Sequence, residues 1–191
     1  MQAVILDFET TGHLPEQDSI FQIAAVAVDL RSGCPLDHFS THLHQEWAAV
    51  PTHVRKLTGI QREDLIHAPM PEAALRELAR FTSRAEWVIA HNARRCEIPF
   101  LRAACLQLGM DVRKVQAWDT VDLSMMIWGQ QVRHNLDSVL QRLGIQTQGF
   151  RRHDARDDVS LLAEALRPML GLIHIKESSW AMPCFEGVLP C

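Results

Sequence analysis

Residues 2–12 read QAVILDFETTG, an apolar run that ends in two acidic residues and a turn sequence. A short apolar run bounded by Thr-Thr-Gly is typical of a buried strand. Because side chains alternate along a strand, Asp7 and Glu9 would point to one face and Phe8 to the other. Two carboxylates at the end of a buried strand are costly unless a metal ion or a basic group neutralises them. The alternative is an exposed strand end that carries two solvated acids.

A second apolar stretch, residues 86–90, is followed by His91-Asn92-Ala93 and then by Glu97 at the start of an expected helix. Pro99 suits the first turn of that helix, where its missing N–H costs little. An acidic residue at a helix start also interacts favourably with the helix dipole. Glu97 therefore has a simple structural explanation as well as a functional one.

A third segment places His153 before an expected helix and Asp158 inside it, with an apolar stripe on the buried side of that helix. The ordinary pKa of histidine, near 6.5, makes His153 a candidate general base beside a metal site. The alternatives are a capping or surface histidine and a solvated acidic face to which Asp154 and Asp157 contribute.

The three segments together supply four carboxylates and one histidine. Mg²⁺ and Mn²⁺ are hard cations that prefer oxygen ligands. A pair of such ions stabilises both the attacking and the leaving oxygen of an in-line displacement at phosphorus. We therefore interpret the chain as a nuclease whose cofactors are two divalent cations, Mg²⁺ or Mn²⁺.

The same segments resemble the Exo I, Exo II and Exo III motifs of the DEDDh-type DnaQ-like 3′→5′ exonucleases. That family includes polymerase proofreading subunits, exonuclease X and the three-prime repair exonucleases. Residues 7–12 match the first motif, and His153, Ala155 and Asp158 match the third. Residues 50–60 resemble the family's linker that ends in H-G-I, with Thr58 in place of the histidine. The resemblance also includes a D-T element at 118–120 and covers about residues 1–170.

The second motif departs from the common pattern. Most members have H-N-A-x-F-D, which would put Cys96 at the metal-binding aspartate. The three-prime repair pattern H-N-G-D-R-Y-D-F-P-L-L aligns without a gap, and it places Arg95 on arginine and Glu97 on the aspartate. We adopt this register because Pro99 and Leu101 also match. Glutamate keeps the charge but is one methylene longer, so a weakened second metal site stays an alternative.

The resemblance implies an α/β fold of the ribonuclease H-like type, a mixed β-sheet flanked by α-helices. It implies release of nucleoside 5′-monophosphates from the 3′ ends of DNA or RNA, preferably single-stranded. Asp7, Glu9, Glu97 and Asp158 would hold the two cations, and His153 would take a proton from the attacking water. These five residues are the expected catalytic set. The expected substrate contacts are Thr10, Thr11, His13, His91, Asn92 and Arg95, with His13 at the position of a base-wedging leucine.

Two other classes of function stay open. One is a nucleic-acid-end-binding module that has lost catalysis through its altered second motif. The other is a proofreading or partner subunit of a polymerase, with residues 171–191 as the docking element. A homodimer is a further possibility, and the sequence does not distinguish DNA from RNA as the substrate.

Composition limits these readings. The chain has 191 residues, of which 47% are hydrophobic. This composition argues against a disordered chain, and the length suits one domain with a hydrophobic core. The net charge of −4 argues against a large basic surface of the kind that binds duplex nucleic acid. A site that binds the end of a strand through metal ions needs fewer basic residues. Five cysteines without a C-x-x-C pair argue against a zinc site. With no signal peptide or membrane-spanning stretch evident, we expect a cytoplasmic protein with reduced thiols and no membrane partner.

The order of expected elements is that of one α/β unit. We expect an exonuclease domain at 1–170 and a C-terminal tail at 171–191, which would pack back on the domain or contact a partner. Closely spaced early strands suggest antiparallel hairpins, whereas a strand at 88–90 between two helices should be parallel to its neighbours. The expected strands are 2–6, 21–28, 39–43 and 88–90, and the expected helices are 71–81, 97–108, 120–128, 136–143 and 154–170.

Overall fold

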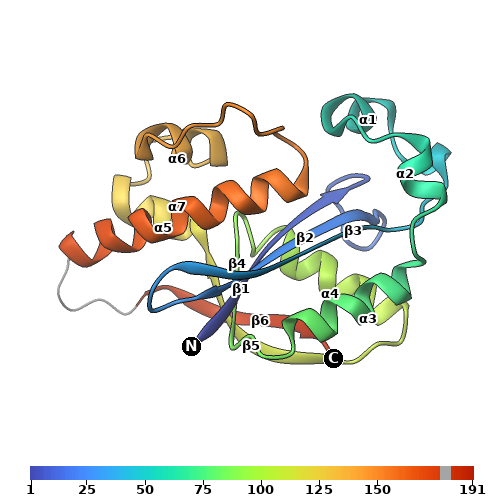
Figure 1. Cartoon of the computed structure of the whole chain (residues 1–191), viewed down its shortest axis with the longest axis horizontal. Helices are drawn as coiled ribbons and strands as arrows, with labels where there is room; N and C mark the ends of the chain where they lie inside the picture. Colours follow the sequence, from blue (N-terminus) through green and yellow to red (C-terminus); the bar gives the residue numbers. More distant parts are fainter. Residues whose placement is uncertain (177–181) are drawn as a thin grey trace.

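The computed structural model describes residues 1–176 and 182–191, and a six-stranded sheet lies at its centre (Figure 1). The strands are β1 (Gln2–Thr10), β2 (Ile20–Asp29), β3 (Cys34–His42), β4 (Trp87–Ala90), β5 (Val112–Asp119) and β6 (Cys184–Pro190). The helices are the 3₁₀ turn η1 (Trp47–Ala49), α1 (Thr52–Thr58), α2 (Arg62–Ile66), α3 (Pro71–Thr82), α4 (Glu97–Gln107), α5 (Thr120–Trp128), α6 (Leu136–Leu143) and α7 (Ala155–Lys176).

The sheet is mixed, as the strand spacing predicts. Its order is β3-β2-β1-β4-β5-β6. β1, β2 and β3 form antiparallel neighbours, whereas β4 runs parallel to both β1 and β5. β1 is therefore a central strand, and its second half, which carries Asp7 and Glu9, extends beyond the carboxyl end of β4 in the same direction. Loops that follow these two strands meet at one edge of the sheet.

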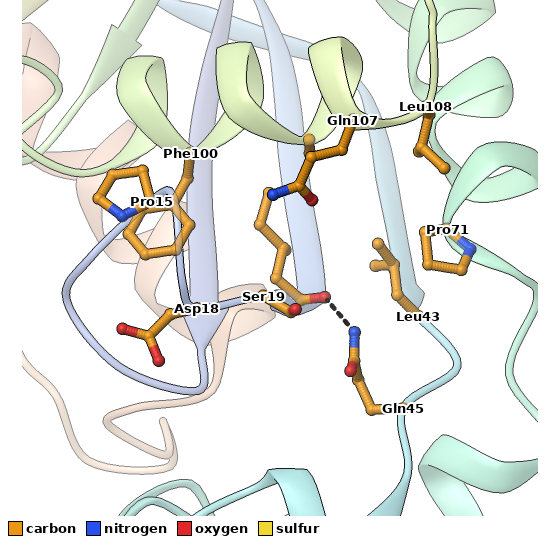
Figure 2. Close-up of a pocket in the computed structure, with 11 residues that line it drawn as sticks. Pro15, Asp18, Ser19, Leu43, Gln45, Pro71, Phe100, Gln107 and Leu108 are labelled. Atoms are coloured by element: carbon orange, nitrogen blue, oxygen red, sulfur yellow. Dashed lines mark hydrogen bonds between the residues drawn. The ribbon is translucent and has the colours of Figure 1, made fainter.

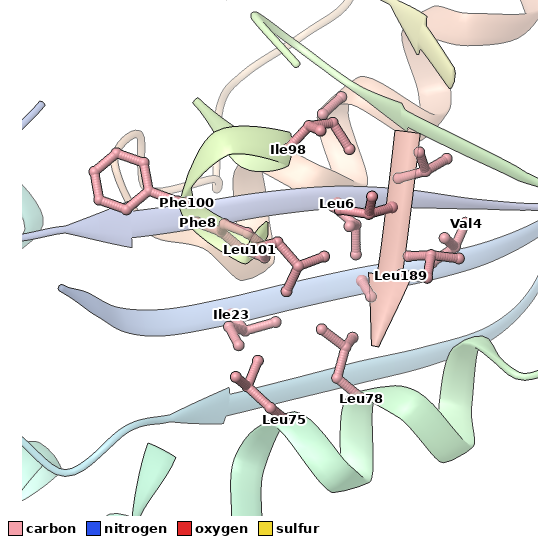
Figure 3. Packing of buried hydrophobic residues seen from close by; sticks show 14 of the residues in the cluster. Val4, Leu6, Phe8, Ile23, Leu75, Leu78, Ile98, Phe100, Leu101 and Leu189 are labelled. Carbon is pink, nitrogen blue, oxygen red and sulfur yellow. The ribbon is translucent and has the colours of Figure 1, made fainter. Parts of the chain in front are cut away.

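Helices cover both faces of the sheet, with α5, α6 and α7 on one side and α3 and α4 on the other (Figure 1). The alternation along β1 decides which side chains each face receives. Val4, Leu6 and Phe8 enter the core beneath α3 and α4 (Figure 3), and Ala3 and Ile5 enter the core beneath α7. The same alternation places the side chains of Asp7 and Glu9 on the α7 side of the strand.

The last strand belongs to this same sheet. β6 pairs antiparallel with β5 over its whole length, and Val188 and Leu189 are buried in the core beneath α3 and α4. α7 continues to Lys176, so the expected boundary between residues 170 and 171 falls inside a helix. Much of the segment expected as a tail thus packs on the domain.

Several elements were not expected from the sequence. β5 mixes polar and apolar residues without a clear period; Lys114 and Gln116 are exposed, whereas Val115 and Ala117 are buried. α1 and α2 have 7 and 5 residues, which is too short for a clear helical period. They form a small lobe with a core of its own, made by Phe21, Val50, Val54, Ile60 and Leu65. No helix in the described ranges is long and apolar enough to cross a membrane.

Candidate active site

Four acidic side chains from three elements meet at the edge of the sheet where β1 and β4 end. We call Asp7, Glu9, Glu97 and Asp158 the acid cluster. Asp7 and Glu9 come from the last half of β1, Glu97 is the first residue of α4, and Asp158 lies in the first turn of α7. The structure therefore brings together residues that are up to 151 positions apart in the sequence.

The tightest part of the site joins Glu9, His153 and Asp158. One ligand atom of each of these residues lies within 4.8 Å of a ligand atom of both others. Carboxylate oxygens and an imidazole nitrogen at this separation can bind one divalent cation. The structure thus brings residues of the first and third sequence segments together.

The acid cluster is short of positive charge. Loss of solvation raises the pKa of Glu97 to about 8 and that of Glu9 to about 7. The pKa of Asp7 is raised well above its usual range by the same loss of solvation and by the charges of Glu97 and Glu9. Negative charges are concentrated here beyond what the nearby side chains neutralise, which is the condition for cation binding.

The surroundings of Glu97 also show that the acid cluster lacks partners for its carboxylate oxygens. Its side chain is 2% exposed, and its Oε2 atom has no hydrogen-bond partner among the described residues. A buried carboxylate oxygen without a partner costs free energy that a ligand can recover. The longer glutamate side chain thus lies within the acid cluster and does not turn away to solvent. The oxygen-rich donor set fits Mg²⁺ or Mn²⁺.

His153 is held in an unusual backbone conformation. Its φ angle is 61°, in the left-handed region that costs a non-glycine residue about 1–2 kcal/mol. Its backbone N–H donates to Asp158 Oδ2 at 3.2 Å, which ties the turn to the first helical turn of α7. Partial burial and the nearby Arg152 charge lower the pKa of the imidazole. At neutral pH the ring is therefore mainly neutral and able to accept a proton.

A buried polar pair fixes the start of α7. Gln22 on β2 donates from Nε2 to Asp154 Oδ1 at 3.0 Å and accepts from the Ala155 N–H at 3.1 Å. Arg156 donates to both carboxylate oxygens of Asp154. Asp154, which the sequence suggested only as part of a solvated acidic face, is thus a buried anchor that positions His153 and Asp158.

Asp119 holds the loop that leads to Glu97. Its carboxylate accepts backbone N–H groups of Asn92 at 2.9 Å, Arg94 at 3.1 Å and Val121 at 2.9 Å. Thr120 adds a hydrogen bond between its Oγ1 and His91 Nδ1 at 2.9 Å. The D-T element thus supports the second motif. The sequence showed the element but not this role, because the role depends on a contact between β5 and a loop after β4.

The six residues expected to contact substrate divide into two groups. His13, Asn92 and Arg95 are exposed. Thr10 donates to the Gly12 carbonyl at 2.6 Å, Thr11 is buried and accepts from the Ser19 N–H, and His91 is half-buried against Thr120.

Arg152 was not singled out from the sequence. Its guanidinium forms ion pairs with Asp158 and with Asp137, the latter from Nε at 2.5 Å. Only its position next to His153 could have drawn attention to it.

A recess of about 110 Å³ lies on the other face of the sheet, between α4 and the loop after β1 (Figure 2). Pro15, Leu43, Phe100 and Leu108 contribute to its walls, and Gln45 Nε2 donates across its floor to the Ile20 carbonyl at 3.3 Å. None of its lining residues belongs to the acid cluster, so this recess is separate from the candidate active site.

A protein family and several known proteins are similar to this chain over most of its length. The family model RNase_T, described as an exonuclease, matches residues 4–166. A DNA polymerase III subunit epsilon-like protein of Rhodobacter capsulatus is 33% identical over 168 residues, which are 87% of this chain and 23% of that protein. The DNA polymerase III subunit epsilon of Aquifex aeolicus is 27% identical over 177 residues, which cover 93% of this chain and 81% of that protein.

The chain spans only part of other relatives, 11% in the case of a PolC-type DNA polymerase III. Among solved structures, the nuclease domain of 3′hExo, a DEDDh family member bound to rAMP, superposes with a TM-score of 0.73 at 16% identity. The superposition covers 97% of this chain and 96% of that one. This likeness confirms the expected ribonuclease H-like fold. With its motifs, its sheet and its family match in agreement, the chain belongs to the RNase_T family of DnaQ-like exonucleases.

Proposed function

We propose that the chain is a metal-dependent 3′→5′ exonuclease that removes nucleoside 5′-monophosphates from nucleic-acid ends, preferably single-stranded. The observation that carries this proposal is the under-neutralised acid cluster with His153 at its side, in a chain of the exonuclease family. Buried carboxylates without enough positive charge around them do not stabilise the fold by themselves. Binding of a cation is therefore the simplest explanation for the acid cluster.

The acid cluster would hold two divalent cations, Mg²⁺ or Mn²⁺. When bound, these ions would supply the positive charge that neutralises the carboxylates and stabilises the charge that develops on the phosphodiester. The charges of Glu97 and Glu9 both act on the carboxylate of Asp7. Asp7, Glu9, Glu97 and Asp158 would together hold the ions.

His153 would act as the general base. Its neutral ring near Glu9 and Asp158 can take a proton from a water molecule as the water oxygen attacks phosphorus. The bond between phosphorus and the 3′ oxygen of the preceding nucleotide then breaks, and that oxygen takes up a proton from solvent water, while His153 returns its proton to solvent. The products are a nucleoside 5′-monophosphate and a strand shortened by one nucleotide.

The substrate contacts would come from exposed and anchored residues together. His13, Asn92 and Arg95 are free to touch a base or a phosphate, and Thr10, Thr11 and His91 would shape the walls beside the terminal nucleotide. A polar recess near the start of α7 is lined by Arg151, Arg156 and Gly59 of the linker, together with Asp64 and Asp154. Because Arg156 is paired with Asp154, Arg151 is the residue that would offer a positive charge to a strand end.

Glu97 is, on this proposal, a working ligand. If glutamate at position 97 had abolished metal binding, we would expect its carboxylate to be hydrogen-bonded within the protein or exposed to solvent. Instead it is buried within the acid cluster with one oxygen unpaired. An impaired end-binding module is therefore the less favoured class.

A second candidate function is proofreading for a polymerase. The similarity to the epsilon subunit of Aquifex aeolicus over 93% of this chain favours it, because that protein is named as a polymerase subunit. The catalytic chemistry would be unchanged. Size-exclusion chromatography of the purified chain with a replicative polymerase of the same organism would test it, and separate elution at micromolar concentrations would reject a stable complex.

The decisive experiment follows 3′-labelled and 5′-labelled single strands of DNA and RNA with Mg²⁺, Mn²⁺ or EDTA. We expect mononucleotide release from the 3′ label, stepwise shortening of the 5′-labelled strand, and full inhibition by EDTA. Internal cleavage, or release from the 5′ end, would contradict the proposal. Binding of ends without cleavage in either metal would favour the impaired module, and restoration by Glu97→Asp would identify position 97 as the cause.

A further inference from the structure

Arg152 places a positive charge inside the acid cluster. Its Nη1 contacts Asp158 Oδ1, and its side chain is 22% exposed while that of Asp158 is 8% exposed. The charge of Arg152 also offsets part of the rise in the pKa values of Asp7 and Glu9, in agreement with its contact with Asp158. Asp158 is at the same time one of the three residues grouped tightly enough to bind a cation.

Arg152 and Asp158 form an ion pair between buried atoms of the two side chains. Nearby, Arg156 is paired with Asp154 instead, and it donates from Nε and Nη2 to the two carboxylate oxygens. Arg156 therefore holds a residue at the start of α7, whereas the charge of Arg152 acts on a member of the acid cluster.

Arg152 also has a second anchor outside the acid cluster. Its Nε donates to Asp137 Oδ1 on α6 at 2.5 Å, and the side chain of Asp137 is 59% exposed. The guanidinium thus bridges a buried carboxylate and an exposed one. If the guanidinium moved away from Asp158, its N–H donors could still bond to Asp137 and to water.

We propose that Arg152 is a built-in counter-cation of the acid cluster, which competes with a divalent cation for Asp158 and so sets the metal affinity of the site. This inference rests on the metal site of the proposed function. In the metal-free protein the guanidinium offsets part of the charge of Asp158. When a divalent cation binds, the guanidinium moves toward Asp137, and the work of separating it from Asp158 weakens metal binding.

The alternative role is a substrate contact, in which Arg152 binds a phosphate and contributes nothing to metal affinity. The two roles differ in a measurement that needs no substrate. Removal of a competing cation tightens metal binding, and removal of a phosphate contact leaves it unchanged.

The test is Mn²⁺ binding to the full-length chain, measured by the loss of the free-ion electron paramagnetic resonance signal at pH 7.5. Arg152→Gln removes the charge, and Arg152→Lys keeps a charge but not the planar guanidinium. Arg151→Gln is the matched control, since Arg151 is the preceding residue, is exposed and has its side chain against Gly59. It removes the same net charge from the same loop without touching Asp158.

We expect Arg152→Gln to bind Mn²⁺ about tenfold more tightly than the natural chain, as expected for loss of a nearby like charge in a partly screened site. Arg151→Gln should change affinity by less than about twofold because its charge is farther away and solvated. Arg152→Lys should stay near the natural value. The Mn²⁺-induced rise in melting temperature should be larger for Arg152→Gln than for the natural chain, and circular dichroism establishes that each variant is folded.

Two other outcomes are informative. A folded Arg152→Gln variant with unchanged or weaker Mn²⁺ binding would overturn the counter-cation role and leave the metal site intact. If the natural chain retained no Mn²⁺ and Arg152→Gln retained none either, the metal site itself would be refuted, and this inference with it.

Discussion

The carboxylates at the end of β1 and the carboxylate at the end of β5 lie two strands apart in one sheet. The two regions differ in how far their buried carboxylates are hydrogen-bonded. Asp119 is 3% exposed and accepts three backbone N–H groups. Glu97 is 2% exposed and keeps one oxygen without a partner among the described residues. A buried carboxylate that is fully paired serves the fold. One that is left unpaired beside other acids is available to a ligand.

The largest effect is expected on the functional side of this comparison. Asp7→Asn removes a carboxylate on which the charges of Glu97 and Glu9 both act, so it should lower kcat/KM by about 10³-fold or more, which corresponds to roughly 4 kcal/mol of transition-state stabilisation. The measurement is mononucleotide release from a 3′-labelled strand in Mg²⁺ and in Mn²⁺.

The metal-free Asp7→Asn protein should melt at or above the temperature of the natural chain, because the lost carboxylate is poorly solvated and surrounded by like charges. This stability measurement is the control for folding. Substantial metal-dependent activity in a folded Asp7→Asn variant would refute the role of Asp7 and would remove the functional half of the comparison.

The structural side should show the reverse pattern. Asp119→Ala leaves backbone donors of Asn92, Arg94 and Val121 without their acceptor, and it should lower the free energy of unfolding by about 3 kcal/mol. Urea unfolding followed by tryptophan fluorescence measures this loss. Asp119→Asn keeps an amide oxygen as an acceptor and should cost less. An Asp119→Ala protein as stable as the natural chain would show that these hydrogen bonds are not needed.

The two regions also differ in how far the sequence predicts them. Asp7 and Glu9 follow a clear apolar run, and the spacing of His153 and Asp158 matches one family motif, so their convergence is predictable. Pro99 supports the register that brings Glu97 into the acid cluster, and the structure places it there. The sequence pattern carries this information because each motif is local.

The region around β5 depends on contacts between distant segments. Asp119 has its role only because the loop at 92–94 lies against it. β6 follows Pro183 and contains Gly187 and Pro190, which suggest irregular structure, yet the strand forms because β5 offers a free edge. The contact between Arg152 and Asp158 is likewise invisible in sequence, since neighbouring arginines give the same pattern.

Gly187 offers a way to sharpen the structural half of the comparison. A Cβ atom at this position would lie 2.6 Å from Val88 Cγ1 and 2.9 Å from Ala117 Cβ, so β6 needs glycine to approach the core. Gly187→Ala should lower the free energy of unfolding by about 2 kcal/mol through overpacking. Melting curves and urea titration provide the measurement.

Gly171→Ala is the matched control for Gly187→Ala. Gly171 lies in α7, is exposed, and has no atom within 4 Å of an added Cβ. The substitution should raise stability by about 0.5–1 kcal/mol because alanine is the better helix former. Equal effects of the two substitutions would indicate that β6 is not packed closely against β4 and β5 in solution.

The smallest effect concerns the pH dependence of the metal-free protein. The pKa of Glu97 rises from 4.5 to about 8 on folding, so folding favours its protonated form. The stability that this provides is fully present below pH 4.5 and is lost as pH rises toward 8. Glu9 and Asp7 act in the same direction because their pKa values are also raised. Stability measured in EDTA should therefore fall between pH 5 and pH 8.

Glu97→Gln should remove one part of that fall. In EDTA the variant should melt about 3 °C above the natural chain at pH 8 and close to it at pH 5, a difference that corresponds to about 1 kcal/mol for a chain of this length. With saturating Mn²⁺ the order at pH 8 should reverse, because the natural chain has one more carboxylate ligand for the ions than the variant. A Glu97→Gln protein that is less stable than the natural chain in EDTA at pH 8 would place Glu97 with Asp119, as a carboxylate that the fold itself requires.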